Sequence, residues 1–135
     1  MFEILDTGSS GLQTQRMRLD AIAENIANIN TTHGPHGEKA PFRRRMVLIA
    51  AGQPNDPSKP GVHVQEIKQD PSPFIQKYEP WNPDADPKTG NVNYPNIDMT
   101  VEYVNALEAS RAYEANVTMM ETAKSMLNSS LRLLA

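Results

Sequence analysis

Two histidines are the first residues whose type and spacing could support chemistry. His33 and His36 bracket a Gly-Pro step, and a gap of two residues is one that metal sites use. A third ligand is missing from this stretch, because His63 lies far along the chain and the sequence has no cysteine. The pair is interpreted as two exposed loop histidines, and no metal site is predicted.

Two aspartates are the second candidate, because Asp84 and Asp86 resemble the start of a calcium-binding loop. Such a loop needs Gly at its sixth position and Glu at its twelfth. Those positions hold Thr89 and Pro95 in this sequence. The pattern therefore fails at its later ligands, and no calcium site is predicted.

Three consecutive arginines at residues 43–45 are the third candidate, since such a run could hold phosphate. Alternate side chains of a strand point to opposite faces, so Arg44 would point away from its two neighbours. Glu38 can also neutralise the cluster locally, and the net charge of the chain is −3. We interpret the run as a solvated strand or an interface salt bridge rather than a nucleic-acid site.

The motifs of the common enzyme classes are missing from the sequence. It contains no Gly-rich phosphate loop, no nucleophile elbow and no Ser/His/Asp grouping. No pair of carboxylates can be singled out for general acid and base catalysis. The sequence therefore predicts no enzyme and no cofactor, and the features to explain are its helices.

The prolines divide the chain into three parts. All 11 prolines lie between Pro35 and Pro95, and residues 96–135 contain neither Pro nor Gly. A chain of 135 residues fits one small domain with extended arms. We predict a mainly α protein with a small β insert: residues 1–32 and 96–135 form long terminal helices that pair like a coiled coil, and residues 33–95 supply short strands and Pro-rich loops.

The N-terminal segment has the seven-residue repeat of a coiled-coil helix. One row is wholly apolar: Leu5, Leu12, Leu19 and Ile26. The companion row is apolar only in its later half: Gly8, Gln15, Ile22 and Ile29. The rows predict a narrow seam that packs against another helix. Residues 30–35, with Gly34 and Pro35, form the expected stop.

The C-terminal segment predicts a longer helix, about 54 Å if it is continuous over residues 99–134. Its first row has seven-residue spacing: Met99, Ala106, Tyr113, Met120, Leu127 and Leu134. The companion row is small or polar and would allow close approach of a partner helix: Ala109, Asn116, Ala123 and Ser130. A further apolar set widens the face: Ile97, Val101, Val104, Val117 and Leu131. Asp98 is the predicted N-cap.

These two helices carry more apolar surface than a chain of this size can bury. One interpretation is a helical hairpin whose two faces cover each other. The other is that the leftover apolar surface binds other subunits, since large exposed apolar faces mark interaction sites. The predicted subunit-interface residues are Leu5, Leu12, Leu19, Ile22, Ile26, Ile29, Met99, Val104, Tyr113, Val117, Met120, Leu127, Leu131 and Leu134.

The middle of the chain predicts three short strands and one stiff loop. Residues 42–50, 62–67 and 74–78 read as strands, and the second of them begins with strict alternation of apolar and polar residues. Residues 79–90 contain three prolines and predict a loop whose backbone is restrained. This part is too small to hold a large core of its own.

Both ends of the chain resemble one bacterial family. The pieces that carry the resemblance are residues 10–16 with Leu19 and residues 23–31, and then residues 94–98 with Glu102, Ala109, Arg111, Tyr113, Ala115 and Asn116. They are similar to the N-terminal and C-terminal signatures of flagellar rod and hook proteins. Residues 78–86, together with the short length, are similar to the proximal-rod member of that family.

The resemblance implies a structural subunit of the proximal rod in the flagellar basal body, the axial drive shaft that transmits motor torque. It implies helical assembly with copies of itself and with other rod proteins (FlgB, FlgF and FlgG) and with the rod-base adaptor FliE. The terminal helices would form the inner coiled-coil domain and residues 33–95 the outer insert. The terminal helices of such proteins are often disordered before assembly.

The resemblance also bears on location. It implies export through the flagellar type III apparatus into the periplasmic rod. This agrees with the absence of a visible cleavable signal, and no apolar run approaches the ~18 residues that span a bilayer. The alternative interpretation is a soluble coiled-coil adaptor that binds a single helical partner.

Overall fold

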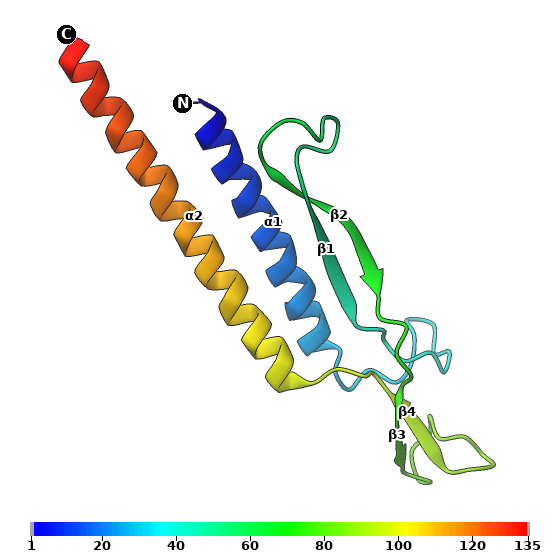
Figure 1. Ribbon diagram of the computed structural model, residues 1–135. Helices are drawn as coiled ribbons and strands as arrows, with labels where there is room; N and C mark the ends of the chain where they lie inside the picture. The colour runs from blue at the N-terminus through cyan, green and yellow to red at the C-terminus, as the bar shows by residue number, and fades with distance from the viewer. Residues whose placement is uncertain (1, 135) are drawn as a thin grey trace.

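The computed structural model describes residues 2–134 as two long helices with two β-hairpins between them (Figure 1). The order is α1 (Phe2–Ala27), β1 (Arg45–Ala51), β2 (Val62–Gln69), β3 (Ile75–Tyr78), β4 (Asn91–Tyr94) and α2 (Met99–Leu134). Helix α1 packs against α2 and also against both strands of the β1–β2 hairpin. The predicted mainly α fold, with long helices at both ends and a small β insert between them, is therefore confirmed, and the strands of the insert form antiparallel hairpins.

Helix α1 has 26 residues and is about 39 Å long. It ends at Ala27, earlier than the expected boundary at residue 32. The side chain of Asn28 donates to the carbonyl of Glu24 at 2.8 Å, and the next turn is closed by Thr31 N donating to Asn28 O at 3.1 Å. Ile29 therefore lies in a turn and not on the helical row to which the sequence assigned it.

Helix α2 runs without interruption over 36 residues, as predicted. Its first turn is capped by Asp98, whose Oδ1 accepts from the backbone N–H of Thr100 at 2.8 Å and of Val101 at 3.4 Å. This confirms the predicted N-cap, which satisfies donors that have no partner inside the helix. The carboxylate also sits at the positive end of the helix dipole.

The four strands form two separate antiparallel hairpins. In the first, Arg45 pairs with Gln69 and Ala51 with Val62, and the register shifts after Leu48 so that Gln65 has no partner. The strand begins at Arg45 rather than at residue 42. The loop that follows it turns at Gly52, whose φ of 90° disfavours other residues.

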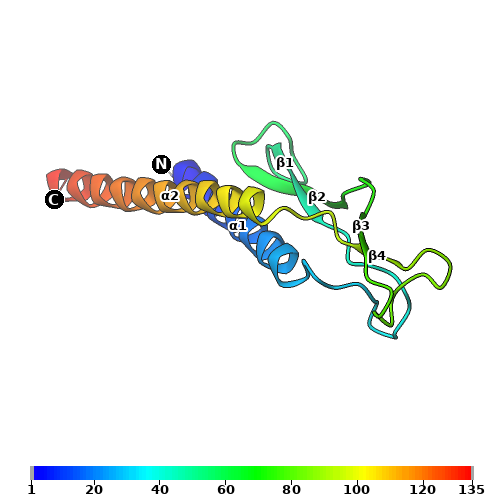
Figure 2. The same cartoon turned by 90° about the horizontal axis from the view of Figure 1, so that it is seen from below.

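The second hairpin pairs Ile75 with Tyr94 and Tyr78 with Asn91. Strand β4 was not predicted, because Asn91 and Asn93 have low intrinsic strand propensity. Pairing with β3 overrides that preference. Figure 2 shows this hairpin projecting beyond the ends of the helices, on the side away from the chain termini.

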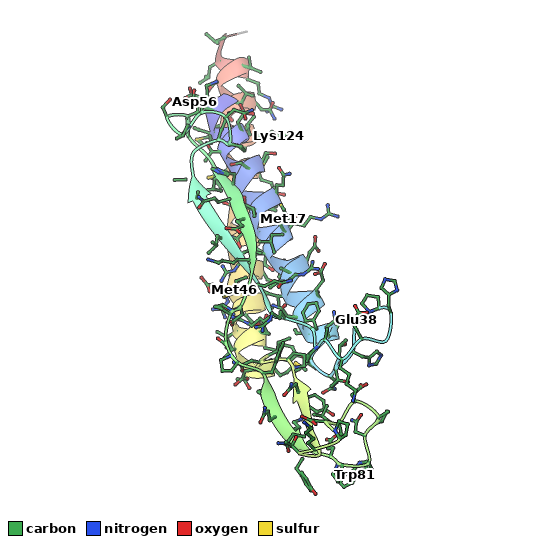
Figure 3. All side chains as sticks on the ribbon, turned by 90° about the vertical axis from the view of Figure 1, so that its right-hand side faces the viewer. Met17, Glu38, Met46, Asp56, Trp81 and Lys124 are labelled. Carbon is green, nitrogen blue, oxygen red and sulfur yellow. The ribbon has the colours of Figure 1, made fainter. Side chains whose placement is uncertain are left out.

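The core of the chain is small and most large apolar side chains are outside it. The buried apolar residues are Ala21, Ile22, Ala85, Val92, Ile97, Ala109 and Ala123. Figure 3 shows side chains standing out along the whole length of the molecule, with Trp81 at one end and Asp56 toward the other. Within residues 2–134, neither helix has a stretch that is apolar enough to cross a membrane. The molecule is an elongated framework that leaves much apolar surface uncovered.

Candidate subunit interface

The two helices meet in an antiparallel seam whose contacts can be followed from end to end. Near the start of α1, a Cβ placed on Gly8 would lie 2.6 Å from Cγ of Met120. A Cβ placed on Gly11 would lie 2.7 Å from Nδ2 of Asn116, so both glycines mark close approach of the helices. Further along, Arg18 pairs with Glu108 at 3.0 Å.

The seam is centred on small and polar side chains rather than on large apolar ones. On α2 the facing row has seven-residue spacing: Glu102, Ala109, Asn116 and Ala123. Glu102, Ala109 and Ala123 are at most 4% exposed. On α1, Ile22 is the only large apolar residue of the described seam that is buried. Small side chains let the two backbones come close, which is why the predicted companion row of α2 faces α1.

The apolar row of α1 lies at the side of this seam. Leu12 follows Gly11 in the chain, and Leu19 follows Arg18, so each is turned about 100° from the residue that faces α2. Leu5, Leu12, Leu19 and Ile26 are all half-buried as a result. These four residues form an apolar strip along one side of the helix pair, and the chain itself covers this strip only in part.

The residues predicted to contact other subunits differ widely in exposure. Ile22 is buried inside the chain, and Ile29, Val117, Met120 and Leu127 are half-buried. The exposed members are Met99 at 37%, Val104 at 59%, Tyr113 at 38%, Leu131 at 56% and Leu134 at 85%. Contact with another subunit by any of them remains a prediction.

The last two turns of α2 extend past the start of α1 (Figure 1). Leu127, Leu131 and Leu134 follow Ala123 at helical spacing. They therefore lie on the same side of α2 as Ala123, which is the side that faces α1 in the earlier turns of the helix. Leu131 is 56% exposed and Leu134 is 85% exposed. We call residues 127–134 the α2 overhang. Leu127 at its start is half-buried, and its last two leucines are exposed in the single chain.

A second apolar area covers the first two turns of α2. Val101 is 48% exposed, and Tyr103, Val104 and Leu107 are each 59% exposed. We call these four residues the α2 outer patch. The chain therefore presents apolar side chains on more than one side of the helix pair, as a subunit with several neighbours requires.

A buried polar cluster ties the helices to the first hairpin. Glu102 of α2 accepts from Nδ2 of Asn25 at 3.2 Å and from Nε of Arg44 at 2.6 Å. Asn25 also exchanges two hydrogen bonds with the backbone of Arg45, donating at 2.9 Å and accepting at 2.8 Å. Asn25 and Glu102 are each 1% exposed. Sequence reasoning missed this cluster, although a lone acid in a row of small residues was a signal.

The three arginines at residues 43–45 all have partners inside the chain. Arg44 also pairs with Asp70 at 3.6 Å. Two hydrogen bonds from Ser72 and the nearby Arg44 hold the pKa of Asp70 below its usual value. Arg43 donates to the backbone carbonyls of Asp70 and Ser72. Arg45 pairs with Glu24 at 2.6 Å. The run fixes the hairpin in place.

Hydrogen bonds to two acidic side chains, Glu79 and Asp84, hold the loop between β3 and β4 in place. Glu79 accepts from Asn82 and from the hydroxyl of Tyr94, each at 3.0 Å. These bonds lower the pKa of Glu79 and raise the pKa of Tyr94. Nearby, Asp84 accepts from the hydroxyl of Thr32 at 2.5 Å, which lowers the pKa of Asp84. The loop is therefore fixed in shape while it carries Trp81, which is 80% exposed.

The residues that were considered as metal ligands in the sequence contact other protein groups in the structure. Nδ1 of His33 lies 3.2 Å from Oδ2 of Asp84, and Oδ1 of Asp86 accepts from the backbone N–H of Lys88. Over residues 2–134, no group of three or more His, Cys, Asp or Glu side chains is placed to hold a metal ion. The candidate site in the part of the chain that the structure describes is thus its helix-pair surface.

Comparison with known proteins agrees with a role in assembly. A family model described as flagella basal body rod protein matches residues 5–35, and one described as flagellar basal body rod FlgEFG protein C-terminal matches residues 88–133. The first match includes most of α1, and the second includes β4 and nearly all of α2. Both family models therefore match the helical parts of the chain.

Three relatives that match over nearly their whole length carry the same name. The flagellar basal-body rod protein FlgC of Yersinia enterocolitica is 40% identical, over 98% of this chain and 97% of its own. The FlgC proteins of Borreliella burgdorferi and Bacillus subtilis are 38% and 36% identical, over 99% and 98% of this chain and 97% of each of their own. The chain therefore belongs to the FlgC family, whose members are structural proteins of the flagellar basal-body rod and not enzymes.

Proposed function

We propose that this chain is a subunit of the proximal part of the rod, and that it assembles helically with copies of itself and with other rod proteins to transmit torque. The observation that carries the proposal is the uncovered apolar surface of the helix pair. The α2 overhang and the α2 outer patch lie on different parts of one helix. Repeating contacts between unlike surfaces build open-ended filaments when the rotation does not close.

We further propose a division of labour along the chain. Residues 1–32 and 96–135 would form the inner domain, with α1 and α2 packing against neighbouring helices as a coiled coil. Residues 33–95 would form the outer insert that locks adjacent subunits. The seven-residue spacing of the rows on both helices supports the first part, since that spacing keeps one seam in register along a helix.

The proposed partners are FlgB, FlgF and FlgG, the adaptor FliE at the rod base, and further copies of this chain. We place the assembled protein in the periplasmic part of the basal body, after export through the flagellar type III apparatus. Ordering of the helices on assembly would let binding supply part of the free energy of folding.

A soluble adaptor that binds a single helical partner is the competing proposal. It requires one apolar face, whereas this chain exposes apolar residues at the α2 overhang and at the α2 outer patch. An adaptor would also remain a discrete complex at every concentration. The exposure of a second apolar surface supports assembly into a rod over a discrete complex.

Genetic replacement tests the proposed function. Cells that lack the gene for this chain should assemble no complete rod and should not swim, and the wild-type gene should restore both. Basal bodies isolated from the restored cells should contain the chain by mass spectrometry. Normal swimming without the gene, or rods that lack the chain, would overturn the proposal.

A further inference from the structure

The contacts of the helix seam repeat every seven residues on both helices. Gly11, Arg18 and Asn25 form one row on α1, and Glu102, Ala109, Asn116 and Ala123 form the facing row on α2. In the structure Asn25 faces Glu102 and Gly11 faces Asn116. A slide of one helix by seven residues keeps both rows facing each other, so the rows alone permit more than one register.

In the two neighbouring registers the rows again bring compatible residue types together. One slide brings Gly11 opposite Ala109, and it also brings Arg18 opposite Glu102, where the two charges attract. The other slide brings Gly11 opposite Ala123 and Asn25 opposite Ala109. In both slides Gly11 again meets a small side chain. The two helices by themselves therefore do not select the observed alignment strongly.

The third element of the cluster does distinguish the registers. Arg44 precedes β1 and donates from Nε to Oε1 of Glu102 at 2.6 Å. Asn25 is held by the backbone of Arg45, through bonds of 2.9 and 2.8 Å, while its Nδ2 also reaches Glu102. Any slide removes Glu102 from Asn25 and Arg44. The slide that offers Arg18 to Glu102 exchanges one charge pair for another but loses the hydrogen bond from the buried Asn25. The other slide leaves Glu102 without a charged partner, which is costly in such a buried place.

We propose that Glu102 sets the register of α1 against α2. Arg44 and Arg45, at the start of the β1–β2 hairpin, fix that register: Arg44 binds Glu102, and the backbone of Arg45 holds Asn25 in place. Glu102 is a positioning residue in this role. Buried polar groups at single seam positions are known to specify register in helix pairs at some cost in stability. A fixed register gives every subunit the same α2 overhang, and this consequence, though not the register itself, rests on the proposed function.

Engineered cysteine pairs can report the register directly, because the chain has no cysteine of its own. Gly11→Cys is combined with Asn116→Cys for the observed register, and with Ala109→Cys or Ala123→Cys for the two slides. Disulfides form when the Cβ atoms are about 4 Å apart. Yield is measured in rods isolated from cells whose only copy is the variant, and in the purified chain for variants that do not enter the rod.

In the parent chain we expect the 11–116 disulfide to exceed each of the other two by at least about tenfold, a preference of about 1.4 kcal/mol. Arg44→Ala or Glu102→Ala should raise the 11–109 yield to a level comparable with 11–116. Glu102→Gln keeps only one acceptor oxygen, which can serve Arg44 or Asn25 but not both, because these donors use different oxygens of Glu102. This variant should therefore give a pattern between those of the parent and Glu102→Ala. Glu108→Ala, which breaks the pair with Arg18 at a side chain that is 65% exposed, is the matched control and should retain the parent pattern.

Two results would overturn the inference. The first is failure of the 11–116 pair to form in the parent chain, which would contradict the register itself. The second is a parent-like pattern in both Arg44→Ala and Glu102→Ala, which would leave Glu102 with a role in stability only. Neither result affects the proposed function, which is judged by the presence of the chain in isolated rods.

Discussion

Glu102 of α2 and Asn25 of α1 meet at 3.2 Å, in a place where each residue is 1% exposed. A carboxylate so deeply placed in a seam of small residues is unusual unless it is paired. Here Arg44 provides the charge and Asn25 a further donor, so the two helices and the start of the first hairpin share one set of bonds. Loss of Glu102 takes the carboxylate from both donors, so that Arg44 keeps only Asp70 and Asn25 keeps only the backbone of Arg45.

Replacement of Glu102 by Ala should therefore destabilise the chain strongly. We expect a loss of about 3 kcal/mol in the free energy of unfolding, because the guanidinium of Arg44 loses its buried carboxylate partner. Urea denaturation of the purified chain, followed by circular dichroism, measures it. Glu108→Ala is the matched control: it breaks the Arg18 pair at a residue whose side chain is 65% exposed, and should cost less than about 1 kcal/mol. Equal losses in the two variants would argue against the cluster.

The α2 overhang should matter for assembly and not for the fold of the single chain. Leu131→Asp changes a residue that is 56% exposed in the chain, so its protein level and helix content should be unchanged. If a neighbouring helix covers the overhang, the new charge is buried without a partner and the rod fails to form. Ser129→Asp, an exposed position at the same helix end, is the control. Swimming motility and recovery of rods are the measurements.

The sides of the helix pair can be tested in the same way. Leu19→Asp and Leu127→Asp place a charge at two half-buried positions, and both should block rod assembly while export remains possible. Export is measured as the amount of the chain outside the cytoplasm. Normal swimming of both variants would contradict the assignment of these rows to subunit contacts.

Trp81 provides a test of the outer insert. Its side chain is 80% exposed on a loop that is fixed by Glu79 and Asp84, so Trp81→Ala should leave the unfolding midpoint nearly unchanged. If the loop locks neighbouring subunits, both this change and deletion of residues 79–90 should reduce rod recovery and swimming. Lys88→Ala, on the same loop, is the control for Trp81→Ala. Rod assembly and motility at the normal level after the deletion would refute the locking role.

Acid should release the same loop in a defined range of pH. The hydroxyl of Thr32 donates to Asp84 and lowers the pKa of that carboxyl from its usual 3.8 in the folded chain. Because the folded pKa lies below the unfolded one, ionised Asp84 stabilises the loop fully above the unfolded pKa, and this contribution is lost as the pH falls through the folded pKa. Trp81 fluorescence should therefore change only below about pH 4.

Thr32→Ala gives the matched comparison for this titration. Removal of the hydroxyl returns the pKa of Asp84 toward its usual value, so the fluorescence change should move to higher pH. His33 remains beside the carboxylate in this variant. An identical titration in the variant and the parent would show that the Thr32–Asp84 bond does not hold the loop.

The two helices could be predicted from the sequence because their signals are local. Seven-residue rows, the Asp98 cap and the absence of Pro and Gly in residues 96–135 depend only on neighbours along the chain. Strand β4 and the buried cluster depend on contacts between distant segments: β4 exists because it pairs with β3, and Glu102 is buried because Arg44 and Asn25 reach it. Such partners are invisible to periodicity.

Which side of α1 packs against α2 also could not be predicted from periodicity alone. Sequence periodicity pointed to the small companion row of α2, and α1 does approach along it at Ala109. On α1 the same reasoning favoured the row that contains Leu12, whereas the residue that faces α2 is Gly11. A single chain pairs its helices where side chains are smallest, and the larger ones are left at the sides and at the overhang. Which of them contact other subunits depends on chains outside this structure, so that part of the predicted interface remains a prediction.

An electron cryomicroscopy map of the isolated basal body would test the central claim most directly. The account predicts density for this chain in the proximal rod, with α1 and α2 in the wall that faces the axis and residues 33–95 on the outside. The leucines of the α2 overhang should lie against a helix of another subunit. A map in which the helix pair faces outward, or in which the chain is absent from the rod, would contradict the account.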